Sequence, residues 1–288
     1  RAIMGENRVL AYHGLRCLNA HPSIGLQAMI EVCGLAGHEL SMNDIIFKIG
    51  PRITPPAVCR TARKAVELLV EKDYAEALER ANRINLYNEA RKDLDKQMTE
   101  EAMDMVAHMP DLDGQRALVI YNEAWHKGVI GIVASRLTEQ YYRPAVVLTR
   151  SEGMATGSAR SVSGFDVYKA VQSCADLLEN FGGHTYAAGL SLKVEHVEQF
   201  RQRFMQYVSE HISEAQTEAT LDIDAVIDFK DITSRFHADL KRFAPSGRAI
   251  RIRVSALTAC MTTAPARWWG ADRSTSSSNW LTTSQTAL

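Results

Sequence analysis

Apolar and polar positions follow a helical period in the first part of this chain. Over residues 61–108 apolar side chains recur every three to four positions, and the positions between them are dense in Arg, Lys, Asp and Glu. The apolar positions are Ala77, Leu78, Ala81, Ile84, Leu94, Met98, Ala102 and Met105. Asp73 and Glu76 are typical of a capping box, which predicts that a long charged helix begins there. Such a helix suits a connector between domains or a helix lying flat on one core, and the pattern leaves both open.

Shorter helices are predicted before this one. The face shared by Leu26, Met29, Ile30 and Cys33 predicts a helix over residues 22–33, with Ser23 as its N-cap. Ser41 followed by Asp44 predicts a capped short helix over residues 42–48, and we interpret residues 1–55 as the tail of a preceding domain.

From residue 115 to 212 the pattern changes to alternating β and α elements. Short apolar runs rich in β-branched residues predict buried strands, and longer amphipathic runs predict helices. The expected strands are Ala117–Tyr121, Ala145–Leu148 and Gly189–Val194, and the expected helices are Val129–Leu137, Val167–Leu178 and Val197–Ile212. This order predicts an α/β domain built on a mixed sheet.

A third region begins near residue 217. Alternation over residues 221–227 predicts a strand, and residues 229–243 predict a helix. From Ser246 the alternation disappears, so we expect residues 246–288 to be poorly packed, and we assign no base-stacking role to Trp268, Trp269 or Trp280.

Composition narrows the class of protein. The 288 residues suffice for two domains, and the hydrophobic fraction of 46% and charged fraction of 23% are ordinary for a globular protein. The net charge of −1 gives no global sign of nucleic-acid binding, although a local groove can be basic on a neutral protein. The five cysteines are scattered without a C-x-x-C pair, which favours reduced thiols in the cytoplasm. We find no membrane-spanning run or signal peptide, and Arg1 in place of Met leads us to expect a fragment.

Residues 182–189, Gly-Gly-His-Thr-Tyr-Ala-Ala-Gly, are the richest in candidate chemistry. Glycines and alanines leave the main-chain N–H groups unshielded, and His184 adds an imidazole, which suits an anion such as a phosphate. The alternative is a tight turn between a helix and a strand, and spacing alone favours that turn.

Three segments together resemble the DHH-associated domain of DHH-superfamily phosphoesterases. The octet resembles that domain's Gly-Gly-His-x-x-Ala-Ala-Gly signature. Residues 125–137 with residues 142–148 resemble its opening in RecJ-type single-strand-specific exonucleases, and residues 157–161 resemble its Gly-Ser-x-Arg-Ser turn. The resemblance is specific over residues 115–210 and weaker on both sides.

The resemblance implies a domain plan. Residues 1–60 would be the C-terminal remnant of a DHH domain, 61–110 a helical connector, and 111–214 the DHH-associated nucleic-acid-binding domain with a mixed sheet. Residues 215–288 would be the truncated start of an OB-like barrel with a frameshifted tail from 246.

The resemblance also implies which residues of the active site this chain contains. DHH phosphoesterases resemble one another in using two divalent metals, Mn²⁺ or Mg²⁺, which clamp and hydrolyse a phosphate. This chain has no Asp-His-His motif and no Asp-x-Asp motif on a buried strand, so we expect the metal ligands, and with them every catalytic residue, to lie outside it. The substrate-binding residues that remain are His184, Gly182, Gly183, Arg160, Ser158, Ser161, His126 and Arg52.

These residues have distinct expected roles. His184 would contact a phosphate while Gly182 and Gly183 open the approach, and Arg160 would bind phosphate with Ser158 and Ser161 as auxiliary donors. His126 precedes a helix N-terminus, so anion binding and an orienting hydrogen bond at the turn are both open. Arg52 would be the phosphate ligand on the DHH side.

Arg52 stands beside a segment that departs from the family. After Gly50-Pro51-Arg52-Ile53 the family continues Asn-Ala-Ala-Gly-Arg-Met, whereas this chain reads Thr-Pro-Pro-Ala-Val-Cys over residues 54–59. A one-base displacement of suitable codons converts the first run into the second, which suggests a compensated frameshift; the gene's nucleotides would test this hypothesis.

The function implied is a 5′→3′ single-stranded-DNA exonuclease of DNA repair and recombination, cytoplasmic, with single-stranded DNA as substrate. Repair partners would include a single-strand-binding protein or a helicase, and no membrane is involved. By itself this chain would grip DNA without cleaving it. The alternatives are another DHH phosphoesterase acting on small nucleotides, such as cyclic dinucleotides or nanoRNA, and a non-catalytic nucleic-acid-binding module.

Overall fold

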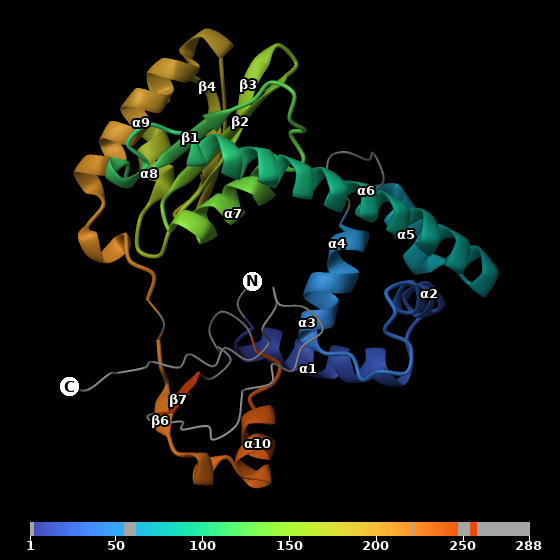
Figure 1. Ribbon diagram of the computed structural model, residues 1–288. Helices are drawn as coiled ribbons and strands as arrows, with labels where there is room; N and C mark the ends of the chain where they lie inside the picture. The colour runs from blue at the N-terminus through green and yellow to red at the C-terminus, as the bar shows by residue number, and fades with distance from the viewer. Residues whose placement is uncertain (1–2, 55–61, 221, 247–253, 258–288) are drawn as a thin grey trace. The chain divides into compact units, whose positions relative to one another are not determined.

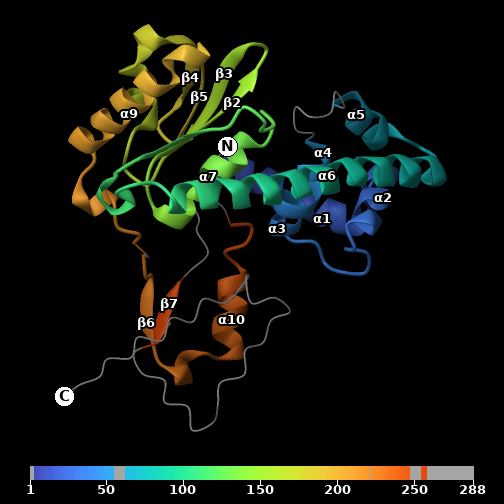
Figure 2. The ribbon, with the colours of Figure 1, turned by 45° about the horizontal axis from the view of Figure 1, so that its top comes forward.

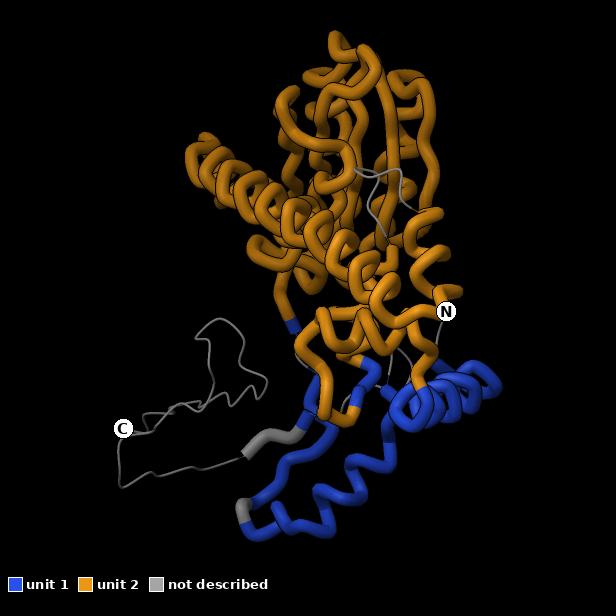
Figure 3. Tube along the Cα trace, turned by 90° about the vertical axis from the view of Figure 1, so that its right-hand side faces the viewer, with its two compact units in different colours: residues 1–21, 40–42, 220–288 blue, residues 22–39, 43–219 orange. Residues whose placement is uncertain are grey.

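The structure is a computed structural model that describes residues 3–54, 62–220, 222–246 and 254–257 (Figure 1). The chain divides into two units, coloured separately in Figure 3: residues 1–21, 40–42 and 220–288, and residues 22–39 and 43–219. The helices are α1 (Gly5–Ala20), α2 (Ile24–Val32), α3 (Met42–Asp44), α4 (Gly50–Ile53), α5 (Ala62–Val70), α6 (Tyr74–Ala107), α7 (Ile130–Tyr141), α8 (Val167–Gln172), α9 (Val197–His211) and α10 (Ser234–Lys241). The strands are β1 (Leu118–Tyr121), β2 (Ala145–Ser151), β3 (Met154–Arg160), β4 (Leu178–His184), β5 (Ala187–Leu192), β6 (Ala225–Ile227) and β7 (Ser255–Leu257).

The larger unit is built on a five-stranded sheet with the order β1-β2-β3-β5-β4. β1 and β2 are parallel, and every other neighbouring pair is antiparallel. The sheet is therefore mixed, as the sequence predicts. The parallel pair needs a crossover connection, and α7 supplies it.

The two faces of this sheet are covered differently (Figure 1). One face packs against α8 and α9, with Phe200 and Phe204 fully buried among small strand residues such as Ala159 and Ala188. The opposite face packs against α7 and the C-terminal part of α6 through a second apolar cluster, which includes Val147. This second cluster takes its strand residues from β1 and β2, and α7 also contacts β3.

Helix α6 contacts both ends of the larger unit. It packs against α2, α4 and α5 and also against α7 and β1, and Figure 2 shows its length between these two groups. Its buried stripe includes the predicted Ala77, Ala81, Ile84 and Met98, so the apolar pattern located the packed face correctly. Since all of these partners lie in the same unit as α6, the contacts leave the connector and the helix lying on one core both open. None of the helices within the described ranges is both long and apolar enough to cross a membrane.

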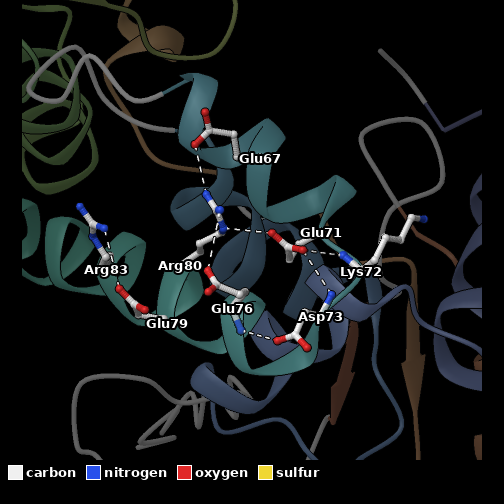
Figure 4. Close-up of polar contacts among 8 residues, drawn as sticks. All are labelled: Glu67, Glu71, Lys72, Asp73, Glu76, Glu79, Arg80 and Arg83. Carbon is white, nitrogen blue, oxygen red and sulfur yellow. Dashed lines mark hydrogen bonds and ion pairs between the residues drawn. The ribbon is translucent and has the colours of Figure 1, made fainter.

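The start of α6 is fixed by side chains (Figure 4). The Asp73 carboxylate accepts a hydrogen bond from the Glu76 backbone N–H at 2.9 Å, which confirms the predicted N-cap. The Glu76 carboxylate lies instead 3.9 Å from Arg80, which also pairs with Glu67 and Glu71. One half of the predicted capping box therefore forms, and Arg80 joins α5 to α6.

The smaller unit contains α1, α10 and the parallel pair β6–β7. Arg8 of α1 donates to the carbonyl of Phe243 at 2.9 Å, and Asn19 exchanges two hydrogen bonds with the backbone of Leu40. A two-stranded parallel pair does not confirm the expected OB-like barrel. Residues 255–257, within the tail that we expect to be poorly packed, form β7 and pair with β6, while residues 258–288 lie outside the described residues.

Several local expectations need correction. Ser23 is the N-cap of α2 by backbone geometry, but its side chain makes no capping bond. The short helix after residue 42 passes into a π-helical turn, Ile45–Ile49, and continues as α4. The helix expected over residues 167–178 ends at Gln172, and the strand and helix expected over 221–227 and 229–243 are shorter, as β6 and α10. Of the run 54–59, only Thr54 is described.

Candidate functional site

The half of the sheet formed by β3, β5 and β4 presents small and polar side chains on the face against which α7 packs. Side chains alternate along a strand, so Ser158 and Arg160 share the face of their neighbours Val147 and Ala145, which pack in the α7 cluster. The register then continues across β5 and β4: Ser158 is opposite Gly189, which is opposite Gly182, and Arg160 is opposite Ala187, which is opposite His184. Two rows of the sheet thus collect four predicted binding residues, Ser158, Arg160, Gly182 and His184.

Arg160 is half-buried beside the first turn of α7. Its guanidinium donates to the Ser158 hydroxyl at 2.7 Å and to the Ala159 carbonyl at 2.8 Å. A Cβ added to Gly131 of α7 would lie 2.8 Å from Arg160 Nη2 and 3.2 Å from Ser158 Oγ. Gly131 therefore makes the room in which the guanidinium lies, and sequence reasoning missed this role although Gly131 stands inside the segment that resembles the family.

The charge of Arg160 has no counter-ion within the described residues. Burial lowers the pKa of the guanidinium from its ordinary value. The group still stays protonated, because the intrinsic pKa of arginine is far above neutral. The N-terminus of α7 adds positive potential: its first turn carries no acidic side chain and Val129 provides no side-chain cap. The arrangement can stabilise an anion.

The two adjacent glycines are not equivalent. Gly183 has a φ of +156°, and a Cβ there would lie 2.3 Å from the Ala187 carbonyl oxygen and 2.6 Å from Ala188 Cα. Gly183 is therefore required by the close approach of β4 and β5. A Cβ on Gly182 or on its partner Gly189 would meet no atom of the other described residues within 4 Å, its chain neighbours aside, so this part of the sheet offers open backbone to a ligand.

His184 stands at the exposed end of β4. Its Nδ1 accepts a hydrogen bond from the Tyr186 backbone N–H at 3.2 Å. In the neutral ring this leaves the proton on Nε2, which can donate to an anion. The octet is therefore a β-hairpin with a turn at Thr185 and Tyr186, rather than a turn between a helix and a strand.

His126 lies in the loop before α7. Its Nδ1 accepts from the Gly128 backbone N–H at 3.0 Å, which is the orienting hydrogen bond considered from sequence, and Nε2 is again the ring's donor nitrogen. The loop is held in place at the neighbouring Trp125, whose indole N–H donates to Glu101 of α6 at 2.7 Å. Thr149 donates to the Trp125 carbonyl at 2.6 Å. Sequence reasoning did not find these two anchors, because their partners are distant along the chain.

Ser161 and Arg52 are engaged elsewhere. The Ser161 hydroxyl donates to the Phe165 carbonyl at 2.8 Å, which fixes the turn after β3. The segment read as a turn from sequence is strand up to Arg160. Arg52 of α4 donates to Asn85 at 2.8 Å and to the Lys48 carbonyl at 2.7 Å, and it lies 3.6 Å from Glu89. These bonds attach α4 to α6, and the phosphate roles of both residues stay predictions.

Within the described ranges, no group of three or more His, Cys, Asp or Glu side chains is arranged to hold a metal ion. The pairs Asp93/Asp95 and Asp222/Asp224 do not form such a group; Asp95 instead pairs with Arg136 at 2.7 Å. The residues described here do not fit the two-metal centre of a phosphoesterase.

Comparison with known proteins assigns the sheet region to a family. Residues 114–210 match the DHHA1 domain. The single-stranded-DNA-specific exonuclease RecJ of Bacillus subtilis is 36% identical over 244 residues, which are 84% of this chain and 31% of that protein. RecJ of Haemophilus influenzae is 34% identical over 227 residues, or 76% of this chain and 40% of that protein.

The chain is a RecJ-type sequence. Among solved structures, RecJ from Thermus thermophilus in complex with Mg²⁺ matches with a TM-score of 0.69 at 27% identity, covering 79% of this chain and 34% of that one. An exonuclease RecJ bound to manganese matches with a TM-score of 0.62 at 28% identity, covering 75% of this chain and 53% of that one. The chain thus spans about a third to a half of the RecJ proteins it matches. These two solved RecJ structures contain Mg²⁺ and manganese, respectively.

Proposed function

We propose that this chain is the backbone-gripping part of a RecJ-like 5′→3′ single-stranded-DNA exonuclease that acts in DNA repair and recombination. The β3–β5–β4 face holds one phosphate of the strand, and Mn²⁺ or Mg²⁺ acts at a centre whose ligands lie outside these residues. By itself the chain binds single-stranded DNA weakly and does not hydrolyse it. A DNA substrate and scattered free thiols favour a cytoplasmic location, with a single-strand-binding protein or a helicase as partners.

The observation that carries this proposal is the uncompensated charge of Arg160. A half-buried guanidinium without a carboxylate partner in the described part of the chain, placed beside the positive end of α7, is costly unless an anion binds. The planar fork of an arginine suits a phosphate, and the Ser158 hydroxyl at 2.7 Å orients it. His184 is in the same row of the sheet and contributes a second donor.

The proposed residues divide into three groups by their surroundings. Arg160, Ser158, His184 and Gly182 form the grip itself, and His126 extends it from the loop before α7. Gly183 supports the grip through the close packing of β4 on β5. Ser161 and Arg52 would have to exchange present hydrogen bonds for a phosphate, so their contribution is smaller.

The test is fluorescence anisotropy of labelled single-stranded DNA across a salt series. Wild type should bind with an affinity that falls as salt rises, and the Arg160→Ala, His184→Ala double variant should bind more weakly with a salt slope lower by about one to two. Arg150→Ala is a matched control, because Arg150 is exposed and paired with Glu123. Binding that is indifferent to the double change would refute the proposal.

Two further arms separate the alternatives. Competition between an oligonucleotide and a cyclic dinucleotide for the wild-type chain should favour the oligonucleotide. Incubation with Mn²⁺ should give no release of mononucleotides. Preferential dinucleotide binding would favour the small-nucleotide phosphoesterases, and turnover by this chain would overturn the assignment of the metal centre to residues outside it.

A further inference from the structure

We propose that Tyr186 forms a nucleobase site at the edge of the phosphate grip, where its ring stacks on the base of the nucleotide that Arg160 and His184 hold. This inference rests on the proposed function and adds a second element of recognition to it. In the Gly-Gly-His-x-x-Ala-Ala-Gly pattern, Tyr186 occupies an unspecified position, so this site belongs to the present chain and not to the motif.

The backbone of Tyr186 is fixed on both sides. Its N–H donates to Nδ1 of His184 at 3.2 Å, and its carbonyl accepts from the Ser161 N–H at 3.2 Å. Thr185, its neighbour in the turn, accepts from the Val167 N–H at 3.0 Å. The hairpin tip is thereby attached to the segment after β3 and to the start of α8. Because the backbone is already held, stacking on this ring would have to order only the side chain of Tyr186.

The ring lies next to the predicted phosphate donor and is open to solvent. The Tyr186 side chain is 42% exposed, and its ring centroid is 6.5 Å from that of His184 with an angle of 67° between the planes. A phosphate bound to Nε2 of His184 would therefore bring its own nucleotide within reach of the phenol ring. Inorganic phosphate would gain nothing from this ring, whereas a nucleotide has an aromatic face to place on it.

The sheet surface beside the Tyr186 ring suits a flat ligand. Gly182 and Gly189 are opposite each other on the same face as His184, and a Cβ added to either meets no atom of the described residues beyond its chain neighbours within 4 Å. Their own row begins at Ser158, and the adjacent row holds Arg160 and His184, so polar donors stand beside the bare backbone. A phosphate held by Arg160 and His184 lies over the row next to the hairpin turn, so its base can reach Tyr186 while the strand continues over the glycines.

Stacking fits a non-specific exonuclease. Every base has an aromatic face, so a phenol ring binds all four bases without reading their edges. The expected consequence is sequence-tolerant affinity, additional to the salt-dependent attraction of the phosphates.

The experiment compares an intact strand with the same strand carrying abasic sites, by anisotropy with the full chain. Tyr186→Ala should weaken binding of the intact strand roughly tenfold, leave the abasic strand unchanged and leave the salt slope unchanged. Tyr186→Phe should bind as wild type does, because the ring is kept. Tyr12→Ala is the matched control: Tyr12 is 45% exposed and also lies against a histidine ring, that of His13 at 5.3 Å, but on α1, outside this sheet. Thermal unfolding confirms that each variant is folded.

The outcomes separate this inference from the proposed function. If Tyr186→Ala binds the intact strand as tightly as wild type while Arg160→Ala weakens it, the base site is wrong and the phosphate grip stands. Equal weakening on both strands also overturns the base site, since it assigns Tyr186 to the shape of the turn. If wild type binds neither strand, the proposed function fails and the base site fails with it.

Discussion

Two neighbouring glycines, Gly182 and Gly183, should respond in opposite ways to the same added methyl group. The Cβ of Gly183→Ala would lie 2.3 Å from the carbonyl oxygen of Ala187 and 2.6 Å from Ala188 Cα, which are backbone atoms that cannot rotate away. The φ of +156° adds strain for any residue with a Cβ. The Cβ of Gly182→Ala would contact nothing within 4 Å.

The magnitudes follow from these distances. Overpacking against backbone costs about 1–3 kcal/mol, so we expect Gly183→Ala to lower the free energy of unfolding by about 2 kcal/mol. For a unit of this size such a loss lowers Tm by roughly 4–8 °C. Gly182→Ala should change stability by less than about 0.5 kcal/mol. Gly182→Ala should nevertheless weaken single-stranded-DNA binding about tenfold, or 1.4 kcal/mol, because the added methyl group projects from the sheet surface on which the strand lies.

Thermal unfolding by circular dichroism and anisotropy on the same samples measure both quantities. Gly189→Ala is the companion variant, since it also adds a methyl to open space on the same face. Equal destabilisation by Gly182→Ala and Gly183→Ala would refute the reasoning from distances. Undiminished DNA binding by both Gly182→Ala and Gly189→Ala would show that the strand does not lie on this part of the sheet.

Three other predictions concern packing. Glu101→Leu should destabilise the fold by about 1–3 kcal/mol in urea titrations, because the buried indole N–H of Trp125 loses its acceptor, whereas Glu101→Gln keeps one. The hydrogen bond from Trp125 lowers the pKa of Glu101, so the stabilisation from the ionised carboxylate is present above the ordinary glutamate pKa and is lost as pH falls through the lower folded pKa. Glu101→Gln should abolish that part of the acid dependence of stability. An unchanged dependence of stability on pH would contradict this prediction. Gly25→Ala should lower the free energy of unfolding by about 3 kcal/mol, since the added Cβ would lie 1.9 Å from the Leu68 carbonyl oxygen. A melting curve like that of wild type would argue against the contact between α2 and α5. Arg52→Met should lower the free energy of unfolding by about 1–2 kcal/mol, because the hydrogen bonds of Arg52 to Asn85 and Lys48 are lost. If the same change also lowers the salt slope of DNA binding by about one, it would support the predicted phosphate role of Arg52.

Periodicity located the elements whose burial is one-sided and apolar. The strands β1 and β2 and the helices α7 and α9 appear close to their expected places, because their apolar side chains recur at the spacing of the element. β3 and β4 were not predicted. β3 alternates small residues such as Ala155 and Gly157 with polar ones such as Ser158, and β4 is an exposed edge strand whose last three residues include two glycines. Neither contains enough apolar surface to mark a strand.

The sequence by itself determined which chemical groups are present and which family they resemble, since a run such as Gly182–Gly189 keeps its residue types in any conformation. Only the tertiary structure decided which of them meet. Cross-strand register put Ser158, Gly189 and Gly182 in one row, and Gly131 made room for Arg160 beside α7. The tertiary structure also gave Gly182 and Gly183 different surroundings, and it engaged Ser161 and Arg52 in other hydrogen bonds. These outcomes depend on contacts between residues far apart in the chain, whose free energies depend on the whole packed sheet and leave no local pattern in the sequence.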